Sequence, residues 1–348
     1  MITPLSFELL MKQFSRVTKK SLWILDENPP LHLPPLNPLI DVISNRIDVV
    51  ESMQARGYHA QFSDFCFDDL AASYQYIFFR ISKEKALAHH VINSAQKLLM
   101  GEGKLIISGA KQEGIKGYID RSKKIYAIRE TLKADKQHWG AVFEPSGPTQ
   151  QPLDDKQYTE LRPIIKNCNN FPDVQFLSKP GVFGWNKIDA GSALLVTHLT
   201  PIYENLNPPK SVLDIGCGYG YLSVACAKLF NAAIVACDNN AAAIKACAAN
   251  LANLNKNHQV IASNCTQNVS GRFDLVVCNP PFHTGFGVEN DLTERFLQGT
   301  KDRLAEGGIA IFVVNLHIPI ERKARQYFKN ISKLSDDKHF KIIKLDNN

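Results

Sequence analysis

Four consecutive residues in the second half of the chain, Asn279-Pro280-Pro281-Phe282, have the chemistry to hold a flat substrate that carries an amine. The side-chain oxygen of Asn279 and the carbonyl of Pro280 can each accept one N–H of that amine. The two prolines fix the turn and remove two N–H donors, so carbonyl groups remain as the exposed polar atoms. Phe282 can stack on an aromatic base, which contributes about 1–3 kcal/mol. Such a pocket requires a base that is extruded from its stack.

A glycine-rich segment precedes this turn. Asp214-Ile215-Gly216-Cys217-Gly218-Tyr219-Gly220 begins at the end of an apolar run that predicts a strand, and Asn279 follows Gly220 by 59 positions. Open α/β sheets bind ligands at the carboxyl ends of their strands. Gly216, Gly218 and Gly220 allow the backbone to turn tightly and approach a ligand without a Cβ clash. Dinucleotide enzymes use a different spacing, G-x-G-x-x-G, to hold a pyrophosphate.

The acid before the glycines favours one cofactor over another. S-adenosylmethionine has no phosphate, but it carries an ammonium and a sulfonium that a negative charge attracts, so Asp214 favours it over NAD. Asp238 ends the next predicted strand, where an acid can accept both ribose hydroxyls. A cap of the helix predicted from Asn240 is the alternative for Asp238. Asn264 follows the third strand and is a candidate for the adenine edge or for a turn.

Two further candidates lie before a helix predicted at Ala193–Leu199. Phe183 can cover the methionine end of the cofactor, and Asp189 can approach its ammonium. Simple capping of the helix by Asp189 or Ser192 is the other interpretation.

The two motifs together predict methyl transfer from S-adenosylmethionine to an exocyclic nitrogen. An exocyclic aromatic amine is a poor nucleophile because its lone pair is delocalised into the ring. In-line transfer to it needs mostly positioning, which contributes several kcal/mol. The proton leaves readily from the cationic product, so no base is required and we assign His283 no catalytic role. Taken alone, the Asn279–Phe282 segment also fits a rigid turn at the end of a strand.

From about Asn170 onward, short apolar runs alternate with helical patterns, which predicts an α/β fold with a largely parallel sheet and helices on both faces. The expected helices are Tyr221–Phe230, Asn240–Leu254 and Leu292–Leu304. The expected strands are Ser211–Ile215, Ala233–Cys237, Gln259–Ala262, Phe273–Cys278, Ile309–Val314 and a closing edge strand, Phe340–Leu345.

The first half of the chain repeats part of this pattern. The sequence of Lys97–Ile107 has the same pattern as that of Asp302–Phe312, and the apolar run Gln75–Phe79 matches Asp274–Cys278. After that run the first half has Arg80-Ile81-Ser82-Lys83, and it lacks a G-x-G-x-G segment. We interpret it as a copy of the fold that binds no cofactor, with chance similarity as the alternative. The expected organisation is a degenerate domain at 1–150, a linker at 151–172 and a catalytic domain at 173–348.

Composition sets wider limits. The 348 residues are 45% hydrophobic, which suffices for two cores. The net charge of +6 fits an anionic partner without requiring one. The eight cysteines include no C-x-x-C pair, so we expect neither a zinc site, another metal site nor a disulfide framework. The sequence shows no signal peptide and no apolar stretch of ~18 residues, so we expect a cytoplasmic protein without a membrane span.

The motifs resemble those of the bacterial ribosomal RNA guanine-N2 methyltransferases, with the small-subunit (16S) enzymes more similar than the large-subunit (23S) enzymes. The similarity lies between Lys179 and Leu316, in the segments Gly181-Val182-Phe183, Asp189-x-Gly191-Ser192, Val212–Gly220, Ala262-Ser263-Asn264, Gly271–Asp274 and Asn279–His283. The resemblance implies two tandem Rossmann-like methyltransferase domains, of which the first is degenerate and helps to bind RNA. It also implies that Asp214, Gly216 and Asp238 bind the cofactor and that Asn279–Phe282 hold guanine.

Guanine is implied by the resemblance alone, because similar turns serve methylation of adenine N6 and of glutamine side chains. A non-catalytic RNA-binding protein is a further alternative. The sequence also leaves open whether the substrate is free rRNA or the assembled small subunit. Two basic groups are candidates for an RNA backbone or for solvated helix faces. They are Lys111, Lys116, Arg121, Lys123 and Lys124, and Arg322, Lys323, Arg325 and Lys329.

Overall fold

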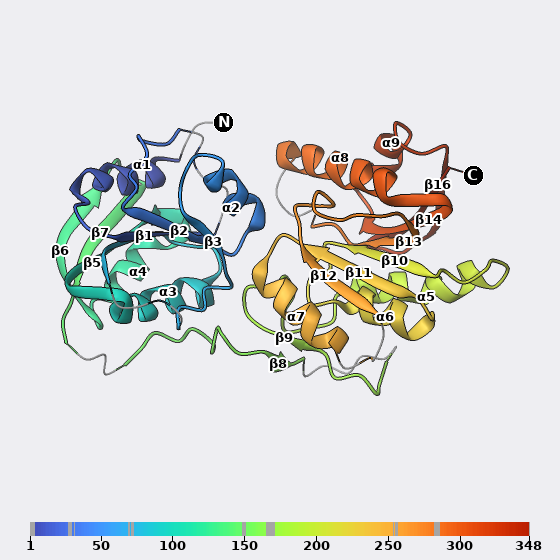
Figure 1. Ribbon diagram of the computed structural model, residues 1–348, viewed down its shortest axis with the longest axis horizontal. Helices are drawn as coiled ribbons and strands as arrows, with labels where there is room; N and C mark the ends of the chain where they lie inside the picture. The colour runs from blue at the N-terminus through green and yellow to red at the C-terminus, as the bar shows by residue number, and fades with distance from the viewer. Residues whose placement is uncertain are drawn as a thin grey trace. The chain divides into compact units, whose positions relative to one another are not determined.

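The computed structural model describes residues 4–26, 30, 32–68, 70, 73–147, 151–164, 171–252, 254, 257–281 and 286–347, without the side chains of 286–291. The chain divides into two compact units, Met1–Glu160 and Leu161–Asn348. Each unit contains a seven-stranded sheet with helices on both faces (Figure 1).

The sheet of the second unit has the strand order β12-β11-β10-β13-β14-β16-β15. The first five strands in this order are parallel, and β16 pairs antiparallel with both β14 and β15. The bounds are β10 Ser211–Ile215, β11 Ala233–Asp238, β12 His258–Ala262, β13 Phe273–Cys278, β14 Leu304–Asn315, β15 Asn330–Asp336 and β16 Phe340–Asp346.

Two apolar cores cover the two faces of this sheet. One face packs against α5 (Ala190–Tyr203), α6 (Tyr221–Leu229) and α7 (Ala241–Ala252). The other packs against α8 (Phe286–Arg303) and α9 (Ile320–Ala324). A short two-stranded sheet, β8 (Arg162–Pro163) with β9 (Leu177–Ser178), precedes α5. The central strands β10 and β13 are buried almost throughout, as a sheet that is covered on both faces requires.

The predicted α/β class is confirmed. The prediction that one strand closes the edge of the sheet is wrong. Phe340–Leu345 is a strand, but as part of β16 it lies between β14 and β15. The edge strand β15 was not expected because its sequence, Asn-Ile-Ser-Lys-Leu-Ser-Asp, has only two apolar residues. An edge strand of this composition needs little apolar sequence because it has a single neighbour and is mostly exposed. The helix expected at Leu292–Leu304 begins earlier, at Phe286.

The sheet of the first unit has the equivalent order, β3-β2-β1-β4-β5-β7-β6. Its helices α1 (Leu5–Met11) and α2 (Ile47–Gln54) pack on one face, and α3 (Lys85–Leu98) and α4 (Ile115–Ser122) pack on the other. The strands are β1 Ser21–Leu25, β2 Ile40–Ser44, β3 Ala60–Phe62, β4 Tyr74–Arg80, β5 Leu99–Ala110, β6 Tyr126–Lys133 and β7 His138–Pro145. Short 3-10 helices, η1 (Lys12–Arg16) and η2 (Lys111–Glu113), adjoin α1 and α4.

The two sheets share their register and an irregularity. Between β4 and β5, the partner of Tyr74 is Leu99 and the partner of Tyr76 is Lys104, so β5 advances five residues while β4 advances two. The pair β13 and β14 contains the same shift, in which Phe273 faces Leu304 and the next partners lie five residues further along β14. A shared bulge of this kind supports duplication, because chance similarity would not place it at the same step.

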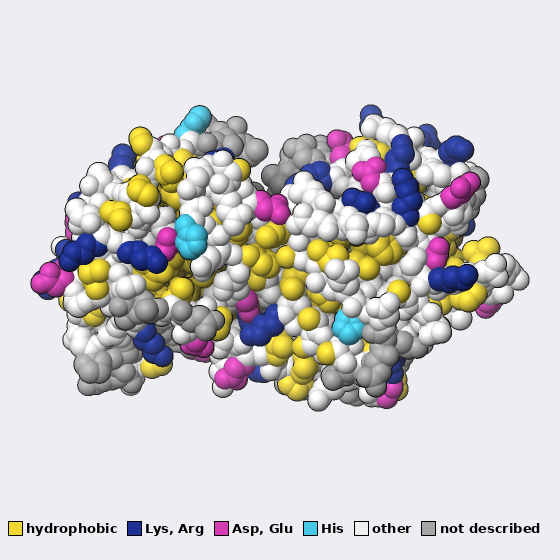
Figure 2. All heavy atoms as spheres, viewed as in Figure 1, with side chains coloured by type: hydrophobic (Ala, Val, Ile, Leu, Met, Phe, Trp, Pro, Cys, Tyr) yellow, Lys and Arg dark blue, Asp and Glu magenta, His cyan; other side chains and the backbone are white. Residues whose placement is uncertain are grey.

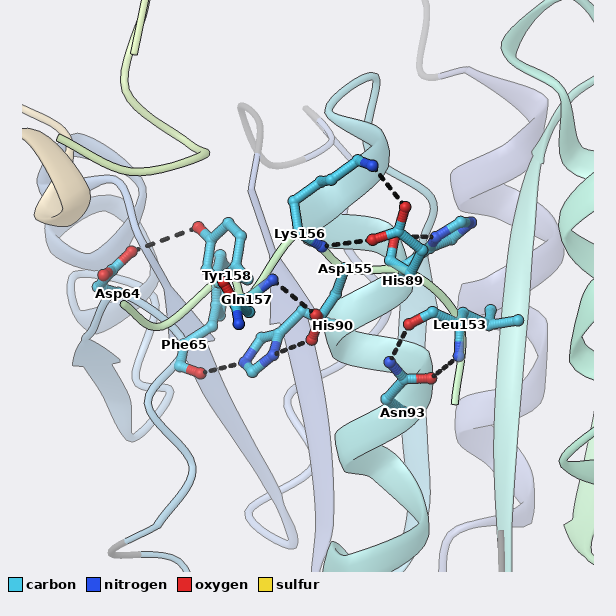
Figure 3. A network of polar contacts seen from close by, with 11 residues as sticks. Asp64, Phe65, His89, His90, Asn93, Leu153, Asp155, Lys156, Gln157 and Tyr158 are labelled. Carbon is cyan, nitrogen blue, oxygen red and sulfur yellow. Dashed lines mark hydrogen bonds and ion pairs between the residues drawn. The ribbon is translucent and has the colours of Figure 1, made fainter. Parts of the chain in front are cut away.

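The segment after β7 is fastened to the first unit (Figure 3). Asn93 of α3 accepts from the Leu153 N–H and donates to its carbonyl, both at 2.8 Å. The His90 ring stacks on Tyr158 with centroids 4.9 Å apart, and its Nε2 lies 2.9 Å from the Phe65 carbonyl. Leu153 and Tyr158 are buried in the apolar core between the first sheet and helices α3 and α4. The first part of the segment 151–172 therefore packs as part of the first unit.

Candidate functional site

Three neighbouring strands bring the predicted site residues to one edge of the second sheet. Ile215 of β10 pairs with Cys237 of β11 on one side and with Cys278 of β13 on the other. The next residues, Gly216, Asp238 and Asn279, therefore follow the carboxyl ends of three adjacent parallel strands. Such strands are about 4.8 Å apart. The glycine turn and the asparagine turn lie on the same edge of the sheet and on neighbouring strands.

Asp214 lies beneath the glycine turn and is 1% exposed. Its Oδ2 accepts from the Ser223 hydroxyl at 2.6 Å, whereas its Oδ1 is buried without a hydrogen-bond partner. Burial raises the pKa of this carboxyl to about 7, although the hydrogen bonds from Ser223 act in the opposite direction. An unpaired buried carboxylate oxygen is costly, so a cation bound at the turn would stabilise the charged form of Asp214.

The three glycines of the turn differ in their surroundings, although all have positive φ. At Gly220 a Cβ would lie 2.8 Å from the Cys247 sulfur of α7, so this glycine allows close packing of the turn against a helix. At Gly216 a Cβ would contact the Phe296 ring at 3.5 Å. At Gly218 a Cβ would meet nothing within 4 Å. Gly218 is therefore the position at which the backbone is open to a ligand.

Asp238 fixes the turn from the neighbouring strand. Its Oδ2 accepts from the Gly218 N–H at 3.0 Å, and its Oδ1 accepts from the Asn240 N–H at 2.9 Å. The cap of α7 is Asn240, whose side-chain oxygen accepts from the Ala242 N–H at 2.8 Å. Asp238 therefore does not cap α7 itself; it binds the backbone of Asn240, the residue that does. A carboxylate at the end of this strand lies where an α/β sheet of this kind binds its ligand.

Asn279 is held by two acceptors from the N-terminal end of α5. Its Nδ2 donates to the Asp189 carboxylate at 2.7 Å and to the Ser192 hydroxyl at 2.8 Å. A carboxylate can only accept hydrogen bonds, so the atom beside Asp189 is the amide nitrogen and the carbonyl oxygen points elsewhere. Both amide hydrogens are thus engaged, and Oδ1 remains as an acceptor. The Asp189 side chain also accepts from the Ser192 N–H at 2.8 Å, so it caps α5 as well.

The remaining predicted residues differ in what the structure shows. Phe183 is 65% exposed. Its loop is tied to the α7 cap, because the Asn240 side chain donates to the Gly181 carbonyl at 3.0 Å. Asn264 follows β12 and accepts from Arg295 at 3.3 Å, so its side-chain oxygen already has one donor. Pro280 is buried and Pro281 is exposed, while Phe282 and His283 lie outside the described residues.

Three polar residues support the site without having been expected to do so. Ser223 holds Asp214, and Ser192 holds Asn279. Asn250 bonds both backbone groups of Leu177 at 2.8 Å and the Tyr219 carbonyl at 2.7 Å, which fastens β9 to the glycine turn. A buried asparagine in the alanine-rich helix α7 was the one available signal, because a buried amide requires partners. The Ser192 contact joins residues 87 positions apart, and no local pattern predicts it.

The two basic groups are distributed over both units. In the first unit Lys116 lies over the Trp139 ring, 4.3 Å from its centroid, and Lys123 pairs with Asp120. In the second unit Lys323 lies 3.7 Å from Glu294. Figure 2 shows Lys and Arg side chains over α9 and its surroundings. An open cavity of about 880 Å³ there is lined by, among others, Lys301, Arg325, Lys329 and Lys333.

Within the described residues, no helix is long and apolar enough to span a membrane. In the same part of the chain, no group of three or more His, Cys, Asp or Glu residues is arranged to hold a metal ion.

Residues 173–344 match the family model of the methyltransferase small domain. The ribosomal RNA small subunit methyltransferase C of Shewanella loihica is 29% identical over 266 residues, which cover 75% of this chain and 73% of that protein. Its counterpart from Salmonella choleraesuis is 34% identical over 176 residues, or 50% of each chain. The solved T. thermophilus 16S rRNA N2 G1207 methyltransferase, in complex with AdoMet and guanosine, superposes with a TM-score of 0.82 at 21% identity, covering 99% of this chain and 92% of that chain.

The sheet edge and the matched family model define the class: the chain is an S-adenosylmethionine-dependent methyltransferase. Within this class it is similar to the ribosomal RNA small subunit methyltransferase C proteins, one of which matches it over 75% of its length. The superposition extends over both units, so the two-domain fold expected from the sequence is confirmed.

Proposed function

We propose that the protein transfers a methyl group from S-adenosylmethionine to the exocyclic N2 of one guanosine in 16S ribosomal RNA, in the cytoplasm. The observation that carries this proposal is the geometry of Asn279. With both amide hydrogens engaged by Asp189 and Ser192, its Oδ1 is oriented as an acceptor beside the glycine turn. An oriented acceptor at this edge suits an amine, whose N–H groups need partners while its lone pair faces the methyl donor.

The proposed cofactor site uses the residues around the glycine turn. Asp214 would attract the positively charged methionine end, and the open side of Gly218 would admit the cofactor. Asp238 would accept the ribose hydroxyls, because it ends the strand next to the glycine turn at the carboxyl edge of the sheet. Gly216 and Gly220 would shape the turn, and contacts of Asn264 with adenine and of Phe183 with the methionine end remain part of the proposal.

The proposed substrate site consists of Asn279 and the three residues that follow. The Asn279 oxygen and the Pro280 carbonyl would each accept one N–H of the guanine amine, and Pro281 would keep the turn rigid. Phe282 would stack on the base. No base is needed to remove the proton, because the methylated ammonium loses it to water. The reaction breaks the sulfur–methyl bond, forms the nitrogen–methyl bond and leaves S-adenosylhomocysteine.

The test is incubation of the protein with tritiated S-adenosylmethionine and rRNA from a strain that lacks this enzyme. The 16S and 23S fractions and intact small subunits are assayed separately and then digested to nucleosides. We expect N2-methylguanosine in 16S rRNA. Label in 23S rRNA, in N6-methyladenosine or in glutamine would overturn the assignment of the substrate. The absence of cofactor binding in a calorimetric titration would instead support a non-catalytic RNA-binding protein.

A further inference from the structure

A cavity of about 590 Å³ in the second unit is lined by residues that belong to neither the proposed cofactor site nor the proposed substrate site. It lies where the end of β14 meets the start of β16. Its lining residues come from the ends of these two strands and from the loops beside them: Asn315, Leu316, His317, Lys338, His339 and Phe340. We propose that it receives a nucleotide next to the target guanosine in the same RNA strand. This inference rests on the proposed function.

The cavity lies at the same edge of the sheet as the target site. Phe312 of β14 pairs with Cys278, so β14 reaches this edge beside Asn279 and continues to Asn315. Asn315 pairs with Phe340 of β16, and the Leu316 N–H donates to the His339 carbonyl at 2.8 Å. The two loops that line the cavity are thus held together by an extension of the sheet.

A packing contact links the cavity to the groups that hold Asn279. A Cβ at Gly191 would lie 3.1 Å from the Phe340 ring, so this ring packs closely against the first turn of α5. Gly191 lies between Asp189 and Ser192, which accept the two amide hydrogens of Asn279. One wall of the cavity therefore packs on the residues that orient the target turn.

The lining fits the two parts of a nucleotide. Phe340 and His339 form an aromatic pair, with centroids 6.4 Å apart, and Leu316 is 42% exposed. These side chains offer an apolar face on which a base can stack. Lys338 and His317 are exposed and offer positive or neutral donors to a phosphate. The nearby Asp337 carboxylate accepts from the His339 and Phe340 N–H groups, both at 2.6 Å, so it is engaged within the hairpin.

Extrusion of the target base supplies a reason for a neighbouring site. A base that leaves its stack exposes the next base in the strand, and an aromatic surface can replace the lost stacking. The cavity therefore contributes to the recognition of RNA rather than of isolated guanosine.

The test compares Lys338→Gln with Lys210→Gln. Both substitutions remove one exposed lysine charge, but Lys210 precedes β10 at the opposite edge of the same sheet. With 16S rRNA as the substrate, we expect Lys338→Gln to raise KM and to reduce the slope of log K against log salt by about 1, as for one lost phosphate contact. The control should match the wild type. Equal slopes and KM values for both variants would overturn the phosphate contact.

Stacking is tested by Leu316→Ala and by cross-linking. Leu316→Ala removes apolar surface that a bound base would cover, at about 0.8 kcal/mol per buried methylene, so we expect a KM for rRNA that is higher by roughly 4-fold or more, with S-adenosylmethionine affinity unchanged. After the methylated position has been mapped, rRNA with 4-thiouridine next to it should cross-link to peptides that contain residues 315–317 or 338–340. If the wild type methylates the RNA but the cross-links lie only in other peptides, the proposed nucleotide site is wrong and the proposed function is not affected. The absence of methylation by the wild type would instead contradict the proposed function.

Discussion

The two halves of the chain place different residues at equivalent positions of one fold. When the registers of the two sheets are aligned, Ile24 and Phe79 correspond to Ile215 and Cys278. Three substitutions at the carboxyl edge then separate the halves: Trp23 stands in place of Asp214, Ser44 in place of Asp238 and Arg80 in place of Asn279. The fold therefore does not need these three polar groups of the second half, which points to ligand binding as the reason for them.

The pair Arg80 and Asn279 shows the difference most directly. Ser192 of α5 accepts a hydrogen bond from Asn279, and Ser6 of α1, the helix that precedes β1, accepts one from Arg80 at 3.0 Å. Arg80 also forms a buried ion pair with Glu113 and is 6% exposed. In the second half the contact between the helix and the strand end orients the Asn279 amide. In the first half the equivalent contact holds Arg80, which forms an ion pair with Glu113 at the same edge of the sheet.

Trp23 reinforces this difference. Its ring is fully buried and packs edge-on against Phe14, with centroids 5.0 Å apart. An indole at this position fills the space with aromatic surface. Both residues have a buried polar atom without a hydrogen-bond partner, Nε1 of Trp23 and Oδ1 of Asp214, but only Asp214 can carry a charge. The first half gains aromatic packing where the second half has an ionisable group.

The largest expected effect is on catalysis in the second half. Asn279→Ala removes the oriented acceptor, and because misplacement of a reacting group by about 1 Å can cost 10²-fold, we expect kcat to fall by about 100-fold or more. S-adenosylmethionine affinity and the free energy of unfolding should change little. Single-turnover methylation and calorimetry measure these quantities, and retained turnover would disprove the role of Asn279.

At the equivalent position of the first half, the effect should be on stability. Arg80→Ala removes the ion-pair partner of Glu113, whose side chain is only 11% exposed, so we expect the free energy of unfolding to fall by up to about 3–5 kcal/mol. A matched double variant, Arg80→Ala with Glu113→Gln, should recover part of this loss because the stranded charge is gone. Denaturant unfolding followed by circular dichroism measures both. A large loss of kcat in Arg80→Ala without a change in stability would break the comparison.

The glycine turn offers a comparison within one loop. Gly220→Ala introduces a Cβ 2.8 Å from the Cys247 sulfur at φ +88°, so folding should suffer. Gly218→Ala has open space at φ +55°, and its cost to folding should stay near the about 1–2 kcal/mol of a left-handed residue. Cofactor affinity, however, should fall in Gly218→Ala because the methyl group enters the proposed path. Thermal unfolding and calorimetry separate the two effects, and equal losses of stability would contradict the assignment.

The sequence predicts the local parts of this picture and misses the contacts between distant residues. The alternation of strands and helices, the glycine turn and the asparagine turn all follow from short patterns. The bond between Asn279 and the start of α5 joins residues 90 positions apart and depends on the tertiary fold. Edge strand β15 escapes the pattern because its side chains are mostly polar and exposed. The sequence shows only that Arg80 stands where the second half has Asn279. Its ion pair with Glu113 becomes visible in the structure.

Asp214 should make stability depend on pH in the second half. Burial raises its folded-state pKa to about 7, whereas an unfolded aspartate has a pKa of about 3.9. Between these values the folded state binds the additional proton, so this group lowers the free energy of unfolding as the pH rises, and the effect levels off above pH 7. Asp214→Asn should flatten the profile, as measured by denaturant unfolding between pH 5 and 8. A profile identical to that of the wild type would contradict the shifted pKa.

The smallest expected effect concerns the support of Asn279. Ser192→Ala removes one of the two bonds to its amide, and the loss of a hydrogen bond worth about 0.5–1.5 kcal/mol predicts a roughly 2- to 12-fold lower kcat. Ser192→Thr keeps the hydroxyl and should restore most of the activity. If both variants lose the same activity, packing rather than the hydrogen bond is responsible.

Calorimetric titration of the full chain with S-adenosylmethionine tests the asymmetry of the two halves most directly. We predict one binding site per chain, lost in Asp238→Ala and retained in Ser44→Ala, the matched variant in the first half. Two sites per chain, or a site that survives Asp238→Ala and disappears in Ser44→Ala, would contradict this prediction.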